Sequence, residues 1–323
     1  NRSRFNIMVT VLYMAPGDKP DPWRDAFLAQ MPEADFRVWS DDPAKDETGD
    51  TADIDYAIVW KPKPGFLKTL PNLKAIFSMG AGVDHLWNDP DLPDSVPLVR
   101  LVDRCLTQGM SEYAVYWTIH HHRKMGVYAG WAAEHKWKRL RQADAEQRRV
   151  GILGLGELGS DAAKKLVPLH YQVAGWARSK KDIPGVECFH GPDQLIPFLN
   201  RTDILICLLP LTPDTQGIVN KDTLAALPEG ACLINCARGG HVVDDDLIAA
   251  LDSGHIAGAT LDVFHTEPLP EDHPYWSHPK VTVTPHMASL TVPHSSTEWY
   301  VKNIQRMEAG EPPLNTVDRG TRY

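Results

Sequence analysis

The chain has 323 residues, enough for two compact domains with a hydrophobic core each, and its 43% hydrophobic and 23% charged residues exclude a disordered protein. The formal net charge of -9, with no dense cluster of Lys and Arg, argues against nucleic acid as a partner. No segment approaches the ~18 apolar residues of a membrane span and the first residues lack a signal-peptide cleavage site, so we expect a cytoplasmic protein without membrane association.

The first hundred residues alternate short apolar runs with breaks rich in Pro, Gly and Asp. Such runs are typical of buried parallel strands connected by short helices. The runs are FNIMVTVLY, FRVW, YAIVW, LKAIFSM and PLVRL. They predict a first α/β domain with five strands.

A long helical pattern follows, from Thr107 to His135. Tyr113, Trp117, His120 and Lys124 recur at spacings of three and four residues, which places them on one helix face. We interpret this segment as a rigid connector into a second domain.

Two groups of possible ligands raise the question of a metal site, but the geometry or number of ligands argues against it in both cases. His120, His121 and His122 are consecutive, but successive helical residues point about 100° apart and cannot chelate one ion together. Cys232 and Cys236 have no second pair of soft ligands near them in sequence. We predict no metal, and five cysteines in mostly apolar runs predict no disulfide.

From Arg149 onward a regular alternation of strands and helices predicts a doubly wound parallel sheet. Six strands are expected, near VGILGL, YQVAGWA, DILICLL, GACLINCA, IAGATLDVF and VTVTPH. A further helix is expected over Val292 to Met307, and it ends before the Pro-rich GEPPLN.

The strongest local signal is Gly154, Gly156 and Gly159, in GxGxxG spacing between an apolar strand and an amphipathic helix. The first glycine permits a tight turn, the second lets the backbone approach a pyrophosphate, and the third allows close packing of helix and strand. Amides at the start of the helix would then face the phosphates. Leu155, Glu157 and Leu158 complete the predicted cofactor loop. Glycines that serve packing alone are the alternative.

About twenty positions beyond the last glycine, an NAD site usually carries an acidic residue that binds the ribose hydroxyls. Arg178, Ser179, Lys180 and Lys181 stand there instead. A guanidinium, a hydroxyl and an ammonium suit a 2′-phosphate, so the segment favours NADPH over NADH. A solvated basic loop without a ligand is the alternative.

Three later segments place Arg238, Glu267 and His286 after apolar strands. Because ligands bind outside the carboxyl ends of strands in an open α/β sheet, these residues can converge. Reduction of a 2-oxo acid needs a cation for the carboxylate, polarisation of the carbonyl and a proton donor. Arg238 suits the first two tasks and His286 the third, with Glu267 favouring the imidazolium. Taken singly, each could be structural.

These segments resemble the D-isomer-specific 2-hydroxyacid dehydrogenase family, and within it the glyoxylate/hydroxypyruvate reductase A type. The resemblance covers nearly the whole chain. It is carried by FSMGAGVDHL, GMSEYAV, GILGLGELG, WARSKK, LLPLTPDTQGIVN, NCARGGHVVDDDLIAALDSGHIAGATLDVF, EPLP and TPHMAS, in this order.

The resemblance implies roles for individual residues. Arg238 would bind the substrate, Glu267 would pair with the catalytic histidine, and His286 would donate the proton. Asp262 would hold the nicotinamide carboxamide. The loop of Gly80, Ala81 and Gly82 would cradle the substrate carboxylate with backbone N–H groups, or else be a plain turn. Further positions implied beside the cofactor are Leu208, Pro210, Thr215, Cys236, Ala237, Ala288 and Ser289.

The family plan also implies two Rossmann-like or flavodoxin-like domains with doubly wound parallel sheets. The substrate domain would be discontinuous, with residues 1–104 plus 290–323, and residues 105–289 would form the NADP-binding Rossmann domain. We expect a homodimer that uses NADPH to reduce glyoxylate or hydroxypyruvate to the D-2-hydroxy acid. A reductase for a bulkier 2-oxo acid and a nucleotide-sensing, corepressor-like binding protein remain alternatives.

Overall fold

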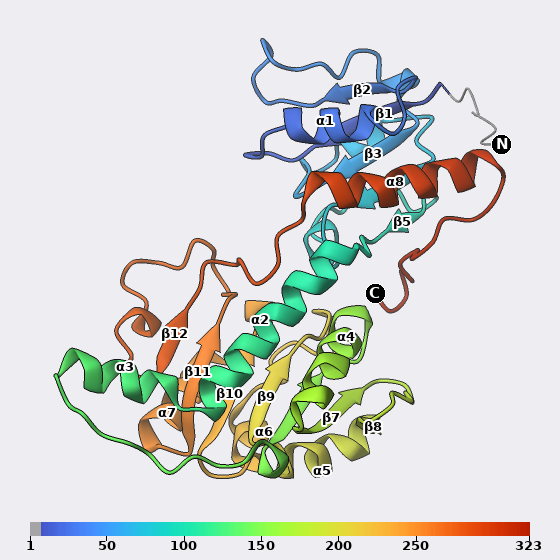
Figure 1. Cartoon of the computed structure of the whole chain (residues 1–323). Coiled ribbons are helices and arrows are strands. Elements are labelled where there is room, and N and C mark those ends of the chain that lie inside the picture. The colour runs from blue at the N-terminus through green and yellow to red at the C-terminus, as the bar shows by residue number, and fades with distance from the viewer. Residues whose placement is uncertain (1–7) are drawn as a thin grey trace. The chain divides into compact units, whose positions relative to one another are not determined.

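The computed structural model describes residues 8–323, so the start of the first predicted strand, Phe5 to Ile7, lies outside the described part. The chain forms two compact units, drawn in Figure 1. The first unit ends at Leu106 and resumes at Thr291, and the second runs from Thr107 to Leu290. The first unit is therefore built from two separate stretches of the chain.

The first unit contains a five-stranded parallel sheet with the order β2-β1-β3-β4-β5. Its strands are β1 (Thr10–Met14), β2 (Asp35–Val38), β3 (Tyr56–Val59), β4 (Ala75–Ser78) and β5 (Leu98–Val99). The helices packed with it are α1 (Asp21–Leu28) and the C-terminal α8 (Pro293–Glu308). The five predicted strands and the predicted last helix are confirmed.

Strand residues of the first unit alternate between two apolar layers. Val11 and Tyr13 of β1 pack in the layer that contains α1 and α8, whereas Leu12 and Met14 pack in the layer on the other face. Successive strand residues point to opposite faces, so a sheet that is covered on both sides needs apolar residues throughout. This explains why the runs are continuous rather than alternating.

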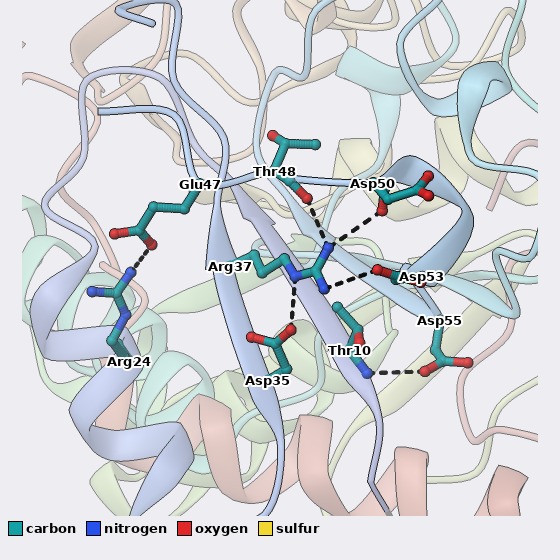
Figure 2. A network of polar contacts seen from close by, with 9 residues as sticks. All are labelled: Thr10, Arg24, Asp35, Arg37, Glu47, Thr48, Asp50, Asp53 and Asp55. Carbon is teal, nitrogen blue, oxygen red and sulfur yellow. Dashed lines mark hydrogen bonds and ion pairs between the residues drawn. The ribbon is translucent and has the colours of Figure 1, made fainter. Parts of the chain in front are cut away.

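Arg37 organises the edge of this sheet, as Figure 2 shows. Its guanidinium donates to Asp35 Oδ2 at 2.7 Å and to Asp53 Oδ2 at 3.2 Å. It also donates to the carbonyl oxygens of Thr48 at 3.0 Å and Asp50 at 3.3 Å. One side chain thus ties the 48–53 segment to the edge strand β2.

The second unit contains a seven-stranded parallel sheet with the order β12-β11-β10-β9-β6-β7-β8. Its strands are β6 (Arg149–Leu153), β7 (Gln172–Ala177), β8 (Glu187–His190), β9 (Ile204–Cys207), β10 (Ala231–Asn235), β11 (Ile256–Leu261) and β12 (Val281–Val283). The six predicted strands are present. The sequence missed β8 because an edge strand of four residues, none of them fully buried, has no continuous apolar run.

The second unit has helices packed on both faces of its sheet and one helix, Met125–Ala133, without a buried residue. They are α2 (Arg104–His122, whose first residues belong to the first unit), α3 (Met125–Ala133), α4 (Glu157–Leu166), α5 (Leu195–Asn200), α6 (Lys221–Ala226) and α7 (Asp244–Ser253). Residues of α2 and α4 share one apolar layer, and residues of α5, α6 and α7 share the other. The strand order reverses between β6 and β9, which is the switch point where such sheets bind ligands.

The prediction of one helix from Thr107 to His135 was wrong. The helix ends at His122 and a separate helix begins at Met125. Lys124 adopts a left-handed backbone with φ of 53°, which interrupts the helical hydrogen bonds. Lys124 consequently does not continue the face formed by Tyr113, Trp117 and His120. The nearest helix-breaking residue, Gly126, lies inside the second helix, and the break itself falls at Lys124.

Within residues 8–323, no helix is long and apolar enough to cross a membrane. In the same residues, His, Cys, Asp and Glu side chains form no cluster that could hold a metal ion. His121 instead makes a hydrogen bond of 2.9 Å between its Nε2 and Thr260 Oγ1. Burial lowers the pKa of His121 to about 4, so this imidazole is neutral.

Candidate active site

The glycine turn after β6 is shaped by close backbone approaches. Gly154 has φ of 101°, and a Cβ atom there would lie 2.7 Å from the carbonyl oxygen of Leu208. A Cβ atom on Gly159 would lie 1.8 Å from the carbonyl oxygen of Gly154. Any side chain at either position would therefore collide with the backbone. Gly156 is the N-cap residue of α4, so the free amides of that helix begin at the turn.

The other residues of the turn differ in what they can offer a ligand. The Leu155 side chain is buried against Gly175 in the apolar core, so only its backbone faces the turn. Leu158 packs at the border of the same apolar layer. Glu157 is exposed. A contact to phosphate at this turn would consequently be made by backbone amides.

The basic segment follows directly after β7. Arg178, Ser179, Lys180 and Lys181 are all exposed. None of them forms an ion pair or side-chain hydrogen bond with another residue between 8 and 323, in contrast to Arg149 of β6, which is paired with Asp203. The charges of this segment are therefore available for an anionic ligand.

The loops after β9 and β10 are connected by a buried histidine that sequence reasoning missed. His241 is fully buried, and its Nδ1 lies 3.2 Å from the backbone nitrogen and 3.1 Å from the carbonyl oxygen of Arg238. Its Nε2 lies 3.2 Å from the carbonyl oxygen of Pro210, which accepts when Nε2 carries the proton. Thr215 closes the first of these loops by donating to the same carbonyl oxygen at 2.6 Å. The one signal in the sequence for His241 is its place in the same short loop as Arg238, three residues further along the chain.

Asn235 holds the loop that carries Arg238. Its side-chain oxygen accepts the N–H of Ala237 at 3.2 Å, and its side-chain nitrogen donates to the carbonyl oxygen of Arg238 at 3.0 Å. Arg238 is half-buried and donates to the carbonyl oxygen of Ala237 at 2.7 Å. Leu208 is also half-buried, whereas the side chains of Cys236 and Ala237 are buried in the core.

His286 and Glu267 form the ionisable pair that the sequence suggested. The Nδ1 atom of His286 lies 2.8 Å from Glu267 Oε2, and both side chains are partly exposed, at 38% and 27%. The other carboxylate oxygen of Glu267 accepts the N–H of Phe264 at 3.1 Å. With Nδ1 held by the carboxylate, Nε2 remains as the second ring nitrogen that can exchange a proton.

The loop of Glu267 is packed against the loop of Arg238. A Cβ atom on Gly239 would lie 2.0 Å from the carbonyl carbon of Phe264, so only glycine permits this approach. The residues after β10, β11 and β12 are thereby brought together at one edge of the sheet. They supply an imidazole, a carboxylate and a guanidinium from three neighbouring strand ends.

Asp262 is buried, with 1% of its surface exposed, directly after β11. Its carboxylate accepts the N–H groups of Met287 and Ala288, both at 2.9 Å. Ala288 is itself 6% exposed, and the following Ser289 is in close contact with Gly109. Asp262 thus has a structural task within the histidine loop in addition to the cofactor contact that the resemblance implies.

The glycine loop of the first unit follows β4. The N–H of Gly80 donates to Ser78 Oγ at 3.2 Å. In the described part of the chain, no hydrogen bond uses the N–H groups of Ala81 and Gly82. Gly80 is required for another reason, because a Cβ atom there would lie 2.8 Å from the Trp60 ring.

A doubly wound sheet with a phosphate-binding glycine turn and an imidazole–carboxylate pair at its carboxyl edge defines a Rossmann-type oxidoreductase. The profile of the D-isomer specific 2-hydroxyacid dehydrogenase NAD-binding domain matches residues 115–288. Because this match covers more than half of the chain and agrees with full-length relatives, the chain belongs to the D-isomer specific 2-hydroxyacid dehydrogenase family.

Three relatives illustrate the similarity. Glyoxylate/hydroxypyruvate reductase A of Serratia proteamaculans is 40% identical over 315 residues, which cover 96% of this chain and 98% of the relative. A D-isomer specific 2-hydroxyacid dehydrogenase from Xanthobacter autotrophicus, crystallised with NADPH and MES, is 43% identical with a TM-score of 0.94, covering 98% and 99% of the two chains. The NADPH-dependent glyoxylate/hydroxypyruvate reductase of Sinorhizobium meliloti, crystallised with NADP and sulfate, is 40% identical with a TM-score of 0.90, covering 98% and 100%.

Proposed function

We propose that this protein uses NADPH to reduce a small 2-oxo acid, such as glyoxylate or hydroxypyruvate, to the D-2-hydroxy acid. The observation that carries the proposal is the 2.8 Å contact between His286 and Glu267 at the sheet edge where the glycine turn also lies. The names of the Serratia and Sinorhizobium relatives support the choice of substrates.

The cofactor fits the residues present. The amides at the start of α4 would bind the pyrophosphate, and Arg178, Ser179 and Lys180 would bind the 2′-phosphate of NADPH. NADPH would supply the hydride. The remaining contacts proposed along the cofactor come from Leu208, Pro210, Thr215, Cys236, Ala237, Asp262 and Ala288.

Arg238 would bind the substrate carboxylate and polarise the carbonyl group that accepts the hydride. In the first unit, the unused N–H groups of Ala81 and Gly82 are suited to a carboxylate, since successive backbone amides favour an anion. Because Gly80 already donates to Ser78, its amide contributes less than the other two. The first unit would accordingly be the substrate domain and the second the NADP-binding domain.

His286 would donate a proton from Nε2 to the carbonyl oxygen as the hydride arrives. Glu267 would hold the orientation of the ring through its contact with Nδ1, so that Nε2 faces the substrate. The contact between His286 Nδ1 and Glu267 would be kept during this proton transfer, because the proton leaves from Nε2.

The test is NADPH oxidation, followed by its absorbance, with 2-oxo acids of increasing size. The highest kcat/KM for glyoxylate or hydroxypyruvate supports the proposal. A higher kcat/KM for phenylpyruvate or 2-oxoisocaproate would assign a bulkier substrate. Nucleotide binding without turnover on any acid would instead favour a sensor that resembles the corepressors.

We further propose that the protein is a cytoplasmic homodimer. Large apolar side chains are exposed on α2, on α3 and in the segment after α3, and they support self-association: Tyr116 at 60%, Met125 at 47%, Val127 at 42% and Trp137 at 93%. Sedimentation equilibrium would decide between the dimer and a monomer of 36.0 kDa.

A further inference from the structure

We propose that Thr284 and Tyr113 are positioning residues for His286, and that their hydroxyl groups act through the carboxylate of Asp262. The inference rests on the proposed function in so far as His286 is the proton donor. It adds a chain of three buried or half-buried side chains that runs from helix α2 to the histidine loop.

Asp262 is the centre of this arrangement. Its carbonyl oxygen accepts the N–H of His286 at 2.8 Å. Its carboxylate accepts from Met287 N and Ala288 N at 2.9 Å each, and from Thr284 Oγ1 at 2.6 Å. Four donors from five consecutive positions therefore converge on one residue. The loop that carries the imidazole is wrapped around Asp262.

The direction of the hydrogen bonds follows from the number of available protons. A carboxylate can only accept hydrogen bonds, so the single hydroxyl proton of Thr284 is donated to Asp262. The contact of 2.7 Å between Tyr113 and Thr284 is then donated by the Tyr113 hydroxyl. Tyr113 thus fixes the rotamer in which Thr284 points its proton at Asp262.

Tyr113 is well suited to this task. It lies on α2, is 7% exposed and packs against the Trp117 ring at 6.0 Å between centroids. Burial, as the largest cause, raises the pKa of its hydroxyl, and the nearby charge of Asp262 raises that pKa further. The phenol therefore keeps the proton that it donates.

His286 needs such support because of its backbone. Its φ of 51° lies in the left-handed region, which non-glycine residues rarely adopt. A residue stays in that region only where surrounding contacts hold it there. The contacts that do so here come from Asp262, and Thr284 sets the orientation of the Asp262 carboxylate. The Nδ1 contact to Glu267 can then form with the loop already in place.

The decisive variants alter Thr284 rather than Asp262, because Asp262 is itself a proposed cofactor contact. T284V removes the hydroxyl with little change in volume, whereas T284S keeps it. T282V is the matched control on β12, because the Thr282 side chain makes no hydrogen bond within residues 8–323. Y113F removes only the first donor of the chain.

We expect T284V to lower kcat for glyoxylate about 10- to 100-fold, since a small misplacement of a reacting group has effects of that order. Y113F should have a smaller effect in the same direction. T284S and T282V should stay within about twofold of wild type both in kcat and in the Kd for NADPH. A larger deuterium isotope effect with 4-deuterated NADPH in T284V would show that the chemical step is slowed.

A second measurement does not depend on turnover. The imidazole NMR signal of His286, assigned by its loss in H286Q, should shift in T284V and Y113F and stay in place in T284S and T282V. An unchanged signal in T284V, or a kcat within about twofold of wild type, overturns the positioning role. An inactive wild-type protein, or an active H286Q variant, refutes the proposed function instead, and the NMR comparison still decides the positioning role.

Discussion

The two units contain the same type of parallel sheet but use polar side chains differently. In the first unit, a charged network surrounds Arg37 at the edge strand β2 and ties a surface segment to the sheet, as Figure 2 shows. In the second unit, buried Asn235, His241 and Asp262 lie at or after the carboxyl ends of β10 and β11. Their partners include backbone groups of the loops that carry Arg238 and His286.

The difference separates polar contacts that stabilise a fold from those that fix a site. A buried polar side chain is costly unless it is fully hydrogen-bonded, so it adopts one arrangement and imposes it on its partners. A surface network tolerates more variation because water can replace a lost partner. We therefore expect substitutions at the carboxyl edge of the second unit to affect catalysis, and substitutions around Arg37 to affect stability.

The largest effect is expected for His286. Replacing it with Ala removes the proton donor and should lower kcat about 10²- to 10⁴-fold, while the Kd for NADPH changes little. Steady-state kinetics and a fluorescence titration of NADPH would measure both quantities. H190A, on the exposed edge strand β8, is the matched control. Near-normal turnover of H286A would remove His286 from the mechanism.

Arg238 should come next. R238A should lower kcat/KM for glyoxylate about 10²-fold or more, because both carboxylate binding and carbonyl polarisation are lost. R238K keeps the charge but not the planar fork, and it should recover only part of the loss. If R238K equals wild type, the arginine acts as a simple point charge.

The basic segment after β7 should determine the choice of cofactor. Arg178→Ala should raise the KM for NADPH about 10-fold with little change for NADH, because only NADPH carries the 2′-phosphate. The effect should weaken at high salt, since the side chain is exposed. Lys221→Ala, exposed at the start of α6, changes the net charge equally and serves as the control. Equal losses for both cofactors would contradict a 2′-phosphate site.

The smallest effect on activity is expected at Arg37. R37M keeps much of the apolar stem but loses hydrogen bonds to Asp35, Asp53 and two carbonyl groups, so unfolding should become easier by about 1–2 kcal/mol, with a Tm lower by a few degrees. The kcat should stay at the wild-type value. R141M, at an exposed position without a side-chain partner in the described residues, is the control for the loss of charge. A large loss of kcat in R37M would contradict the view that the polar contacts of the first unit stabilise the fold and do not affect catalysis.

Local patterns predicted most of the fold. The eleven apolar runs became strands, most of them buried, and the glycine spacing predicted a turn whose close approaches permit no Cβ at Gly154 or Gly159. The sequence failed at β8 and at Lys124. An edge strand needs little apolar surface, and a left-handed residue other than glycine has no compositional signal.

The sequence by itself determined which chemical groups the protein has. Its apolar runs also predicted that Arg238, Glu267 and His286 follow strands and lie at one edge of a sheet. Only the tertiary structure decided how those groups are held: that His241 links two loops, that Gly80 donates to Ser78, and that Asp262 binds the backbone of the histidine loop. The physical reason is that a hydrogen bond between residues distant in the chain depends on distances of a few tenths of an ångström. Residue spacing along the sequence does not contain such distances.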